Sequence, residues 1–127
     1  MNKKVILGQS IVEFALILPS MLLLILGVLE FGRLFYMKVA LQNAAREGAY
    51  YISYYPDDIP GMKIAVANEA ISAGIELDPD VDITLNNCCT RFEYVEVIVK
   101  QDNVDLLIYG FLTGNVNLSS KARMMVQ

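Results

Sequence analysis

The chain has 127 residues, a formal net charge of −4 and a hydrophobic fraction of 55%, which is high for a small soluble domain. The length suits one domain, and the basic residues form no stripe that would indicate a nucleic-acid partner. Without His, a phosphate loop or a paired nucleophile and base, the sequence predicts neither an enzyme nor a cofactor-binding protein.

The apolar excess is concentrated near the N-terminus. Residues 14–29 carry no charge, and with their neighbours they approach the ~20 residues that a membrane-spanning helix needs. The segment lacks the polar stripe of a surface helix in a soluble domain. It is too long for the apolar part of a signal peptide, and no A-x-A cleavage site follows it. We therefore predict one transmembrane segment at about residues 11–31.

The charges around this segment favour one orientation weakly. Lys3, Lys4 and the α-amino group lie on the short N-terminal side, whereas Arg33 and Lys38 follow the segment. The positive-inside rule then places the N-terminus in the cytoplasm, and a long C-terminal part translocates largely regardless of its charge. The expected location is the cytoplasmic membrane, with a single pass and the C-terminal domain outside.

The predicted helix extends well beyond the membrane, over residues 9–55, with Pro19 as its only strong breaker. Past the membrane it becomes amphipathic, with Leu34, Leu41, Ala44 and Ala45 opposite the charged residues. Four tyrosines near its end could form an adhesive patch, but their spacing favours packing of the helix against a sheet: Tyr50, Tyr51, Tyr54 and Tyr55.

The remainder, residues 56–127, reads as an exported α+β domain. A second helix is expected at about 60–76, with an apolar stripe of Ile64, Ala67, Ile71 and Ile75. Three strands follow: one around Val81 to Leu85, one at 91–100 and one at 116–126. The middle strand is apolar on both faces and should be central in an antiparallel sheet. Residues 106–112 are expected to be a short helix or loop covering the sheet. The fold class is α+β, with the sheet packed on both helices.

Two features of the exported part could carry chemistry. The acidic stretch at 78–82 resembles a calcium loop, but Cys89 stands where the pattern requires Glu, so no metal site is predicted. Cys88 and Cys89 are adjacent, which excludes the usual zinc and redox spacings. A strained vicinal disulfide, a bond to another subunit and two free thiols all stay open.

The residue that most needs an explanation is Glu13, which stands immediately before the apolar run. A charge at membrane depth costs about 2.5 kcal/mol or more, so such residues usually have a partner and a function. Glu13 either snorkels at the membrane edge or serves in assembly. Glu30 and Arg33 read as a local i,i+3 ion pair at the opposite interface.

The segment GQSIVEF followed by an apolar helix has the form of a prepilin processing site. The stretches LGVLEFGR and LQNAAREGA, with YVEVIVK and SSKARMMVQ further on, closely resemble the TadE-like pseudopilins of tight-adherence (Tad) type IV pilus systems. The resemblance implies a leader of residues 1–8, cleavage between Gly8 and Gln9 by a prepilin peptidase, and Glu13 and Phe14 as early residues of the mature helix. Gly8 as an ordinary helix-start residue is the alternative.

This resemblance implies a structural pilus subunit whose partners are other pilins, the Tad assembly machinery and membrane lipid. Cleavage would give Gln9 a free α-amino group, four residues from Glu13 in its own helix or near the Glu13 of a neighbouring subunit. Either pairing would reduce the cost of burying both charges. An uncleaved single-pass membrane protein with an exported partner-binding domain is the second hypothesis.

Overall fold

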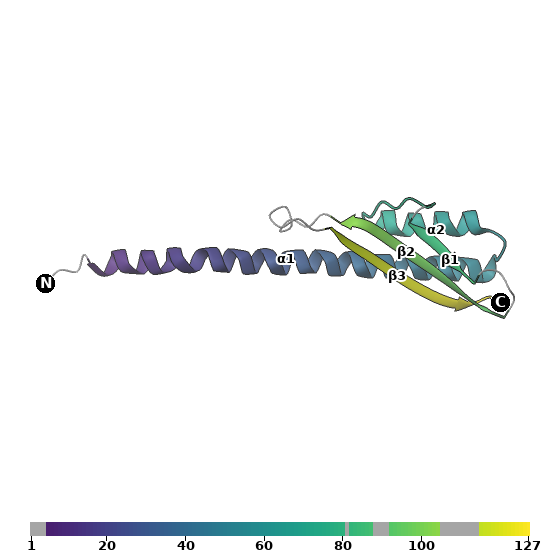
Figure 1. The fold of residues 1–127 in the computed structure, drawn as a ribbon, viewed down its shortest axis with the longest axis horizontal. Coiled ribbons are helices and arrows are strands. Elements are labelled where there is room, and N and C mark those ends of the chain that lie inside the picture. The colour runs from purple at the N-terminus through teal and green to yellow at the C-terminus, as the bar shows by residue number, and fades with distance from the viewer. Residues whose placement is uncertain (1–4, 81, 88–91, 105–114) are drawn as a thin grey trace.

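The computed structural model describes residues 5–80, 82–87, 92–104 and 115–127. It contains five elements: α1 (Val5–Tyr54), α2 (Ile59–Ser72), β1 (Ile83–Asn86), β2 (Tyr94–Val104) and β3 (Val116–Met125). Figure 1 shows that α2 and the sheet pack beside the C-terminal half of α1, while its N-terminal half projects alone. The expected α+β class and the long N-terminal apolar helix are confirmed.

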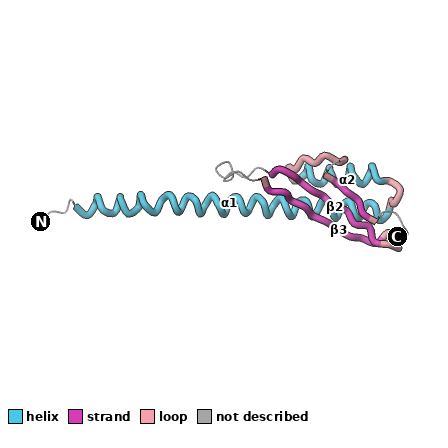
Figure 2. The backbone as a smooth tube through the Cα atoms, in the orientation of Figure 1, coloured by secondary structure: helices cyan, strands magenta, loops and turns pink. Residues whose placement is uncertain are grey.

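The three strands form an antiparallel sheet in the order β1-β2-β3, with β2 in the centre as predicted. Figure 2 shows the strands running side by side next to α1. The second strand is longer than expected and begins later, at Tyr94, and a register irregularity lies between Gln101 and Val104. Val81 and the predicted covering segment at 106–112 lie outside the described residues.

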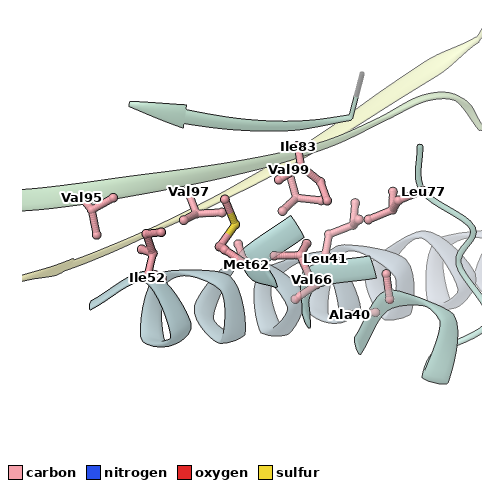
Figure 3. Close-up of a cluster of buried hydrophobic side chains, with 14 of the residues drawn as sticks. Ala40, Leu41, Ile52, Met62, Val66, Leu77, Ile83, Val95, Val97 and Val99 are labelled. Carbon is pink, nitrogen blue, oxygen red and sulfur yellow. The ribbon is translucent and has the colours of Figure 1, made fainter. Parts of the chain in front are cut away.

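One hydrophobic core joins the sheet to both helices. Val95, Val97 and Val99 on β2 are fully buried, and they meet Leu41 of α1 and Met62 of α2 in the same cluster (Figure 3). Along β3, every second residue from Val116 to Met124 is buried or half-buried, and the residues between them are exposed. This period-2 alternation is typical of a strand with one face on the core.

Gly48 allows the three layers to approach closely. A Cβ atom at this position would collide with Val66 Cγ2 of α2 and would lie 3.2 Å from Val97 Cγ1 of β2. The small residues around it on α1, Ala44, Ala45 and Ala49, are all fully buried. α1 thus presents a nearly flat strip to its neighbours, and this strip determines how deeply α2 can pack.

The buried face of α2 differs from the predicted one. Met62, Val66, Ala67 and Ala70 are buried, whereas Ile64 and Ile71 are 59% and 56% exposed, so these two assignments were wrong. Both stripes have helical spacing, so periodicity cannot choose between them. The packing against Gly48 chooses the stripe that contains Val66 and the small Ala70.

The ends of both helices also differ from the expected bounds. α2 stops at Ser72 instead of residue 76, because Gly74 adopts a positive φ of 76° and forms a Schellman-type cap. In that cap Gly74 N–H donates to Ile71 C=O at 2.8 Å and Ile75 N–H donates to Ala70 C=O at 2.9 Å. α1 begins at Val5, four residues before the expected start, so it continues through Gly8 and Gln9.

Candidate assembly interface

The N-terminal half of α1 is apolar and uncovered. Within the described residues this helix is the one long and apolar enough to cross a membrane, and no residue in its most apolar window is buried. Exposure is found all round the helix, as in Phe14 at 61%, Leu16 at 75% and Leu24 at 68%. Water is a poor environment for such a surface, so a lipid bilayer or other helices must cover it.

Carboxylates stand at both ends of this apolar segment. Glu13 precedes it and Glu30 follows it, which at 1.5 Å per residue separates them by about 26 Å, close to the thickness of the hydrocarbon core. Glu30 is 7% exposed, and its Oε1 lies 3.9 Å from Nη1 of Arg33. The expected i,i+3 pair is therefore confirmed, and the segment is compatible with a single membrane pass.

The residues of the expected processing site lie on one exposed helical turn. The bond between Gly8 and Gln9 is inside α1, and no other side chain lies within 4 Å of a Cβ placed on Gly8. Gln9 Nε2 donates to Glu13 Oε1 at 3.2 Å, so these two residues share a helix face. Phe14 is next to that face and is exposed.

The tyrosines at the other end of α1 do not pack against the sheet as a group. Tyr50, Tyr54 and Tyr55 are 50–61% exposed, so that prediction was wrong for three of the four. They stack on one another instead: the ring centroids of Tyr50 and Tyr54 are 5.0 Å apart, and those of Tyr51 and Tyr55 are 5.2 Å apart. The i,i+4 spacing that suggested a buried face equally produces stacked pairs on an exposed face.

Tyr51 is the exception, because it packs on the core and ties α1 to α2. Its hydroxyl donates to Asp58 Oδ2 at 2.7 Å, and Gly61 N–H donates to Asp58 Oδ1 at 2.9 Å. Asp58 is thereby the N-cap of α2. The Tyr51 hydrogen bond, followed by that of Gly61, lowers the pKa of Asp58, and the same contact raises the pKa of Tyr51.

In the acidic stretch at 78–82, the carboxylates of Asp78 and Asp82 accept hydrogen bonds from nearby backbone N–H groups. Asp78 N–H donates to Asp82 Oδ2 at 2.8 Å, and Asp80 N–H donates to Asp78 Oδ1 at 3.0 Å. Lys63 Nζ lies 2.8 Å from Asp80 Oδ1 and lowers the pKa of that carboxyl by its hydrogen bond. Among the residues that the structure describes, no cluster suited to a metal ion is found. Cys88 and Cys89 lie outside the described residues.

Sequence reasoning missed a contact line between α1 and the edge of β3. Lys38 Nζ donates to Ser119 C=O, and Gln42 Nε2 donates to Lys121 C=O at 2.9 Å. The sequence predicted no partner for either side chain. Their four-residue spacing, which continues to Arg46 and Tyr50, was the available signal, but it became meaningful only once a strand edge lay alongside it.

Comparison with known proteins agrees with the character of α1. No curated protein and no solved structure matches the chain. Residues 8–49, which contain the apolar half of α1 and much of its packed half, match a protein-family model. That family is described as TadE-like protein, and the match confirms over this segment the resemblance to the TadE-like family that the sequence indicated.

Proposed function

We propose that this chain is a structural subunit, a minor pilin or pseudopilin, of a bacterial Tad-type pilus. It inserts into the cytoplasmic membrane with its N-terminus inside and its C-terminal domain outside. A prepilin peptidase then cleaves it after Gly8, and it joins other pilin subunits through its apolar helix. The exposed tyrosines at the far end of α1 would serve surface adhesion.

The observation that carries this proposal is the division of α1 into a bare half and a covered half. The covered half packs against the small domain and the other half projects alone (Figure 1). The apolar side chains of the projecting half are exposed all round the helix. A helix of this kind can sit first in lipid and later among other helices, because both environments are apolar. The TadE-like match includes this bare half from Gly8 onward.

Glu13 receives a specific role under this proposal. Cleavage would create an ammonium group at Gln9, whose side chain already contacts Glu13 across one helical turn. In an assembly the same ammonium could meet the Glu13 of an adjacent subunit. Removing one member of a buried ion pair typically costs about 3 to 5 kcal/mol, so the carboxylate should matter after cleavage rather than before it.

Processing is tested by intact-mass measurement on the membrane-extracted protein from cells that make the prepilin peptidase. The expected mass corresponds to a chain that begins at Gln9. Gly8→Leu should abolish this trimming while leaving membrane insertion intact, because the small residue before the scissile bond is lost. A wild-type chain that still begins at Met1 would favour the uncleaved single-pass membrane protein instead.

Assembly is tested by Glu13→Gln, with Glu76→Gln on the exposed surface of the C-terminal domain as the matched control. We expect the Glu13 variant to be cleaved and to stay in the membrane but to be lost from sheared filaments or from crosslinked complexes with other pilins. The Glu76 variant should be recovered at the wild-type level. Wild-type recovery of the Glu13 variant would show that the carboxylate only snorkels.

A further inference from the structure

A line of regularly spaced α1 side chains follows the free edge of β3. β3 is an edge strand, because among the described strands it pairs with β2 alone. Lys38 and Gln42 close the first two positions of this line through hydrogen bonds to the carbonyls of Ser119 and Lys121. Advancing four residues on the helix and two on the strand covers about 6 Å and 6.8 Å, so the line stays in register. By the same spacing, the next positions along the line would place Arg46 beside Arg123 and Tyr50 beside Met125.

The backbone of β3 alternates between β2 and the free edge. Val126 faces β2, because its N–H donates to Glu93 C=O at 3.0 Å and its C=O accepts from Phe92 N–H at 3.1 Å. Successive residues of a strand point their N–H and C=O groups to opposite sides. Arg123 and Met125 therefore point theirs outward, as Ser119 and Lys121 do.

The line is interrupted at these two residues. It resumes only at the end of the chain, where Gln127 N–H donates to Ser53 C=O at 3.2 Å. In the described part of the chain, no α1 side chain reaches the outward carbonyls of Arg123 or Met125. A groove of about 640 Å³ opens beside Arg123, with Arg46 and Tyr50 of α1 and Lys121 to Met124 of β3 among its lining residues. An unpaired strand edge beside a groove is the geometry to which an extended peptide adds as a further strand.

The charges on the edge indicate what kind of strand would fit. Both charged side chains that β3 presents there, Lys121 and Arg123, are cationic, while the acidic lining residues Glu47 and Glu69 come from the helices. Glu96 of β2 already lies across from Arg123, with 2.7 Å between Glu96 Oε1 and Arg123 Nε. An added strand with a carboxylate across the other side of Arg123 would repeat this favourable cross-strand pair.

A second copy of this chain fits the edge less well. If two β3 strands paired antiparallel about Arg123, the two guanidinium groups would stand directly opposite each other. A register centred on Lys121 would do the same with two ammonium groups. Like charges directly opposite destabilise a strand pair, so these registers are disfavoured and a different chain is the better occupant.

We propose that the outer edge of β3 at Arg123 and Met125 is a docking site for an extended, acidic segment of a partner protein, which adds to the sheet as a fourth strand. The α1 side chains Lys38 and Gln42 block the proximal part of the edge and so determine where the added strand can lie. This site does not depend on cleavage after Gly8 or on a place in a pilus.

The test uses the purified full-length chain in detergent and two fluorescent peptides. In both peptides every second residue is charged and the residues between are Val or Thr. The charged residue is Glu in one peptide and Lys in the other. Fluorescence anisotropy should show binding of the Glu peptide and at least tenfold weaker binding of the Lys peptide. Hydrogen exchange should slow at the amides of Arg123 and Met125 when the Glu peptide is bound.

Proline variants locate the binding edge. Met125→Pro removes an outward N–H and leaves the hydrogen bonds to β2 intact. We expect it to lower the affinity for the Glu peptide at least tenfold. Ser119→Pro removes an equivalent N–H where Lys38 already occupies the edge, so its affinity should stay at the wild-type value. Equal binding to both variants, or unchanged exchange at Arg123 and Met125, would overturn the proposal.

A charge-swapped variant keeps the test informative even if a proline unfolds the sheet. Glu96→Lys combined with Lys121→Glu and Arg123→Glu keeps opposite charges in both cross-strand ion pairs within the sheet and reverses both charges that β3 presents at the edge. This variant should prefer the Lys peptide over the Glu peptide. Retention of the original preference, or self-association of the wild-type chain that the Glu peptide cannot displace, would contradict an acidic strand from a partner.

Discussion

Substituting Gly48 by alanine probes the closest approach in the domain. The new Cβ would lie against Val66 Cγ2 at a separation that real Cβ atoms do not show, with Val97 Cγ1 at 3.2 Å and Met62 Sδ at 3.4 Å. Val66 is fully buried and β-branched, so its side chain has little freedom to rotate away. α2 itself must therefore shift.

The size of the effect follows from two opposing contributions. Overpacking a core by one methyl group costs about 1–3 kcal/mol, whereas replacing a helical Gly by Ala gains about 1 kcal/mol. The expected net loss is about 1 kcal/mol, which corresponds to a fall in Tm of roughly 4–8 °C for a domain of this size. Gly32→Ala is the matched control, because a Cβ there meets nothing within 4 Å.

Thermal unfolding of the full-length chain in detergent, followed by circular dichroism, measures these differences. A double-mutant cycle with Val66→Ala isolates the contact: that substitution alone should cost about 2 kcal/mol, and the double variant should lose less than the sum of the two. If Gly48→Ala melts at or above the wild-type Tm, or if the two losses simply add, α2 does not pack on Gly48 as described.

Three further predictions concern the C-terminal domain. A fragment of residues 34–127 should be soluble and give a mixed helix and strand circular dichroism spectrum, because the core joins α1, α2 and the sheet; an all-helical spectrum would exclude the sheet. The pKa of Asp58 lies below its ordinary value of 3.8 because Tyr51 and Gly61 donate hydrogen bonds to the carboxylate. The ionised carboxylate therefore stabilises the fold fully above the ordinary pKa, and this stabilisation is lost as the pH falls through the folded-state pKa. Asp58→Asn should therefore reduce the decrease in Tm between pH 5 and pH 2, and an unchanged decrease would contradict the cap. Glu96→Gln removes the ion pairs with Arg123 and Lys121. The small decrease in Tm that it causes should be smaller at high salt, because salt screens exposed ion pairs. An equal decrease at low and high ionic strength would contradict a role of these ion pairs in stability.

The pattern of residues along the chain was sufficient to determine the class of the fold. An uninterrupted apolar stretch with the length of a membrane span can hardly be anything but a long helix, because no water-soluble element leaves so much apolar surface without a polar stripe. The centre of the sheet was equally readable, because Val95, Val97 and Val99 form one apolar face and the opposite face also carries the apolar residues Tyr94 and Ile98. Edge strands keep one polar face, as β3 does with Lys121 and Arg123.

Only the tertiary structure decided which of several equivalent faces is buried. Ile64 and Ile71 offer a more hydrophobic stripe than Val66 and Ala70, but Gly48 admits the smaller one, and close packing outweighs hydrophobicity alone. Tyr50, Tyr54 and Tyr55 stay exposed because Ala45, Ala49 and Ile52 form the side of α1 that packs on the core there. The edge line from Lys38 to Tyr50 exists only because β3, some 80 residues further along the chain, lies beside it. Such contacts depend on the distance between elements, which local periodicity does not encode.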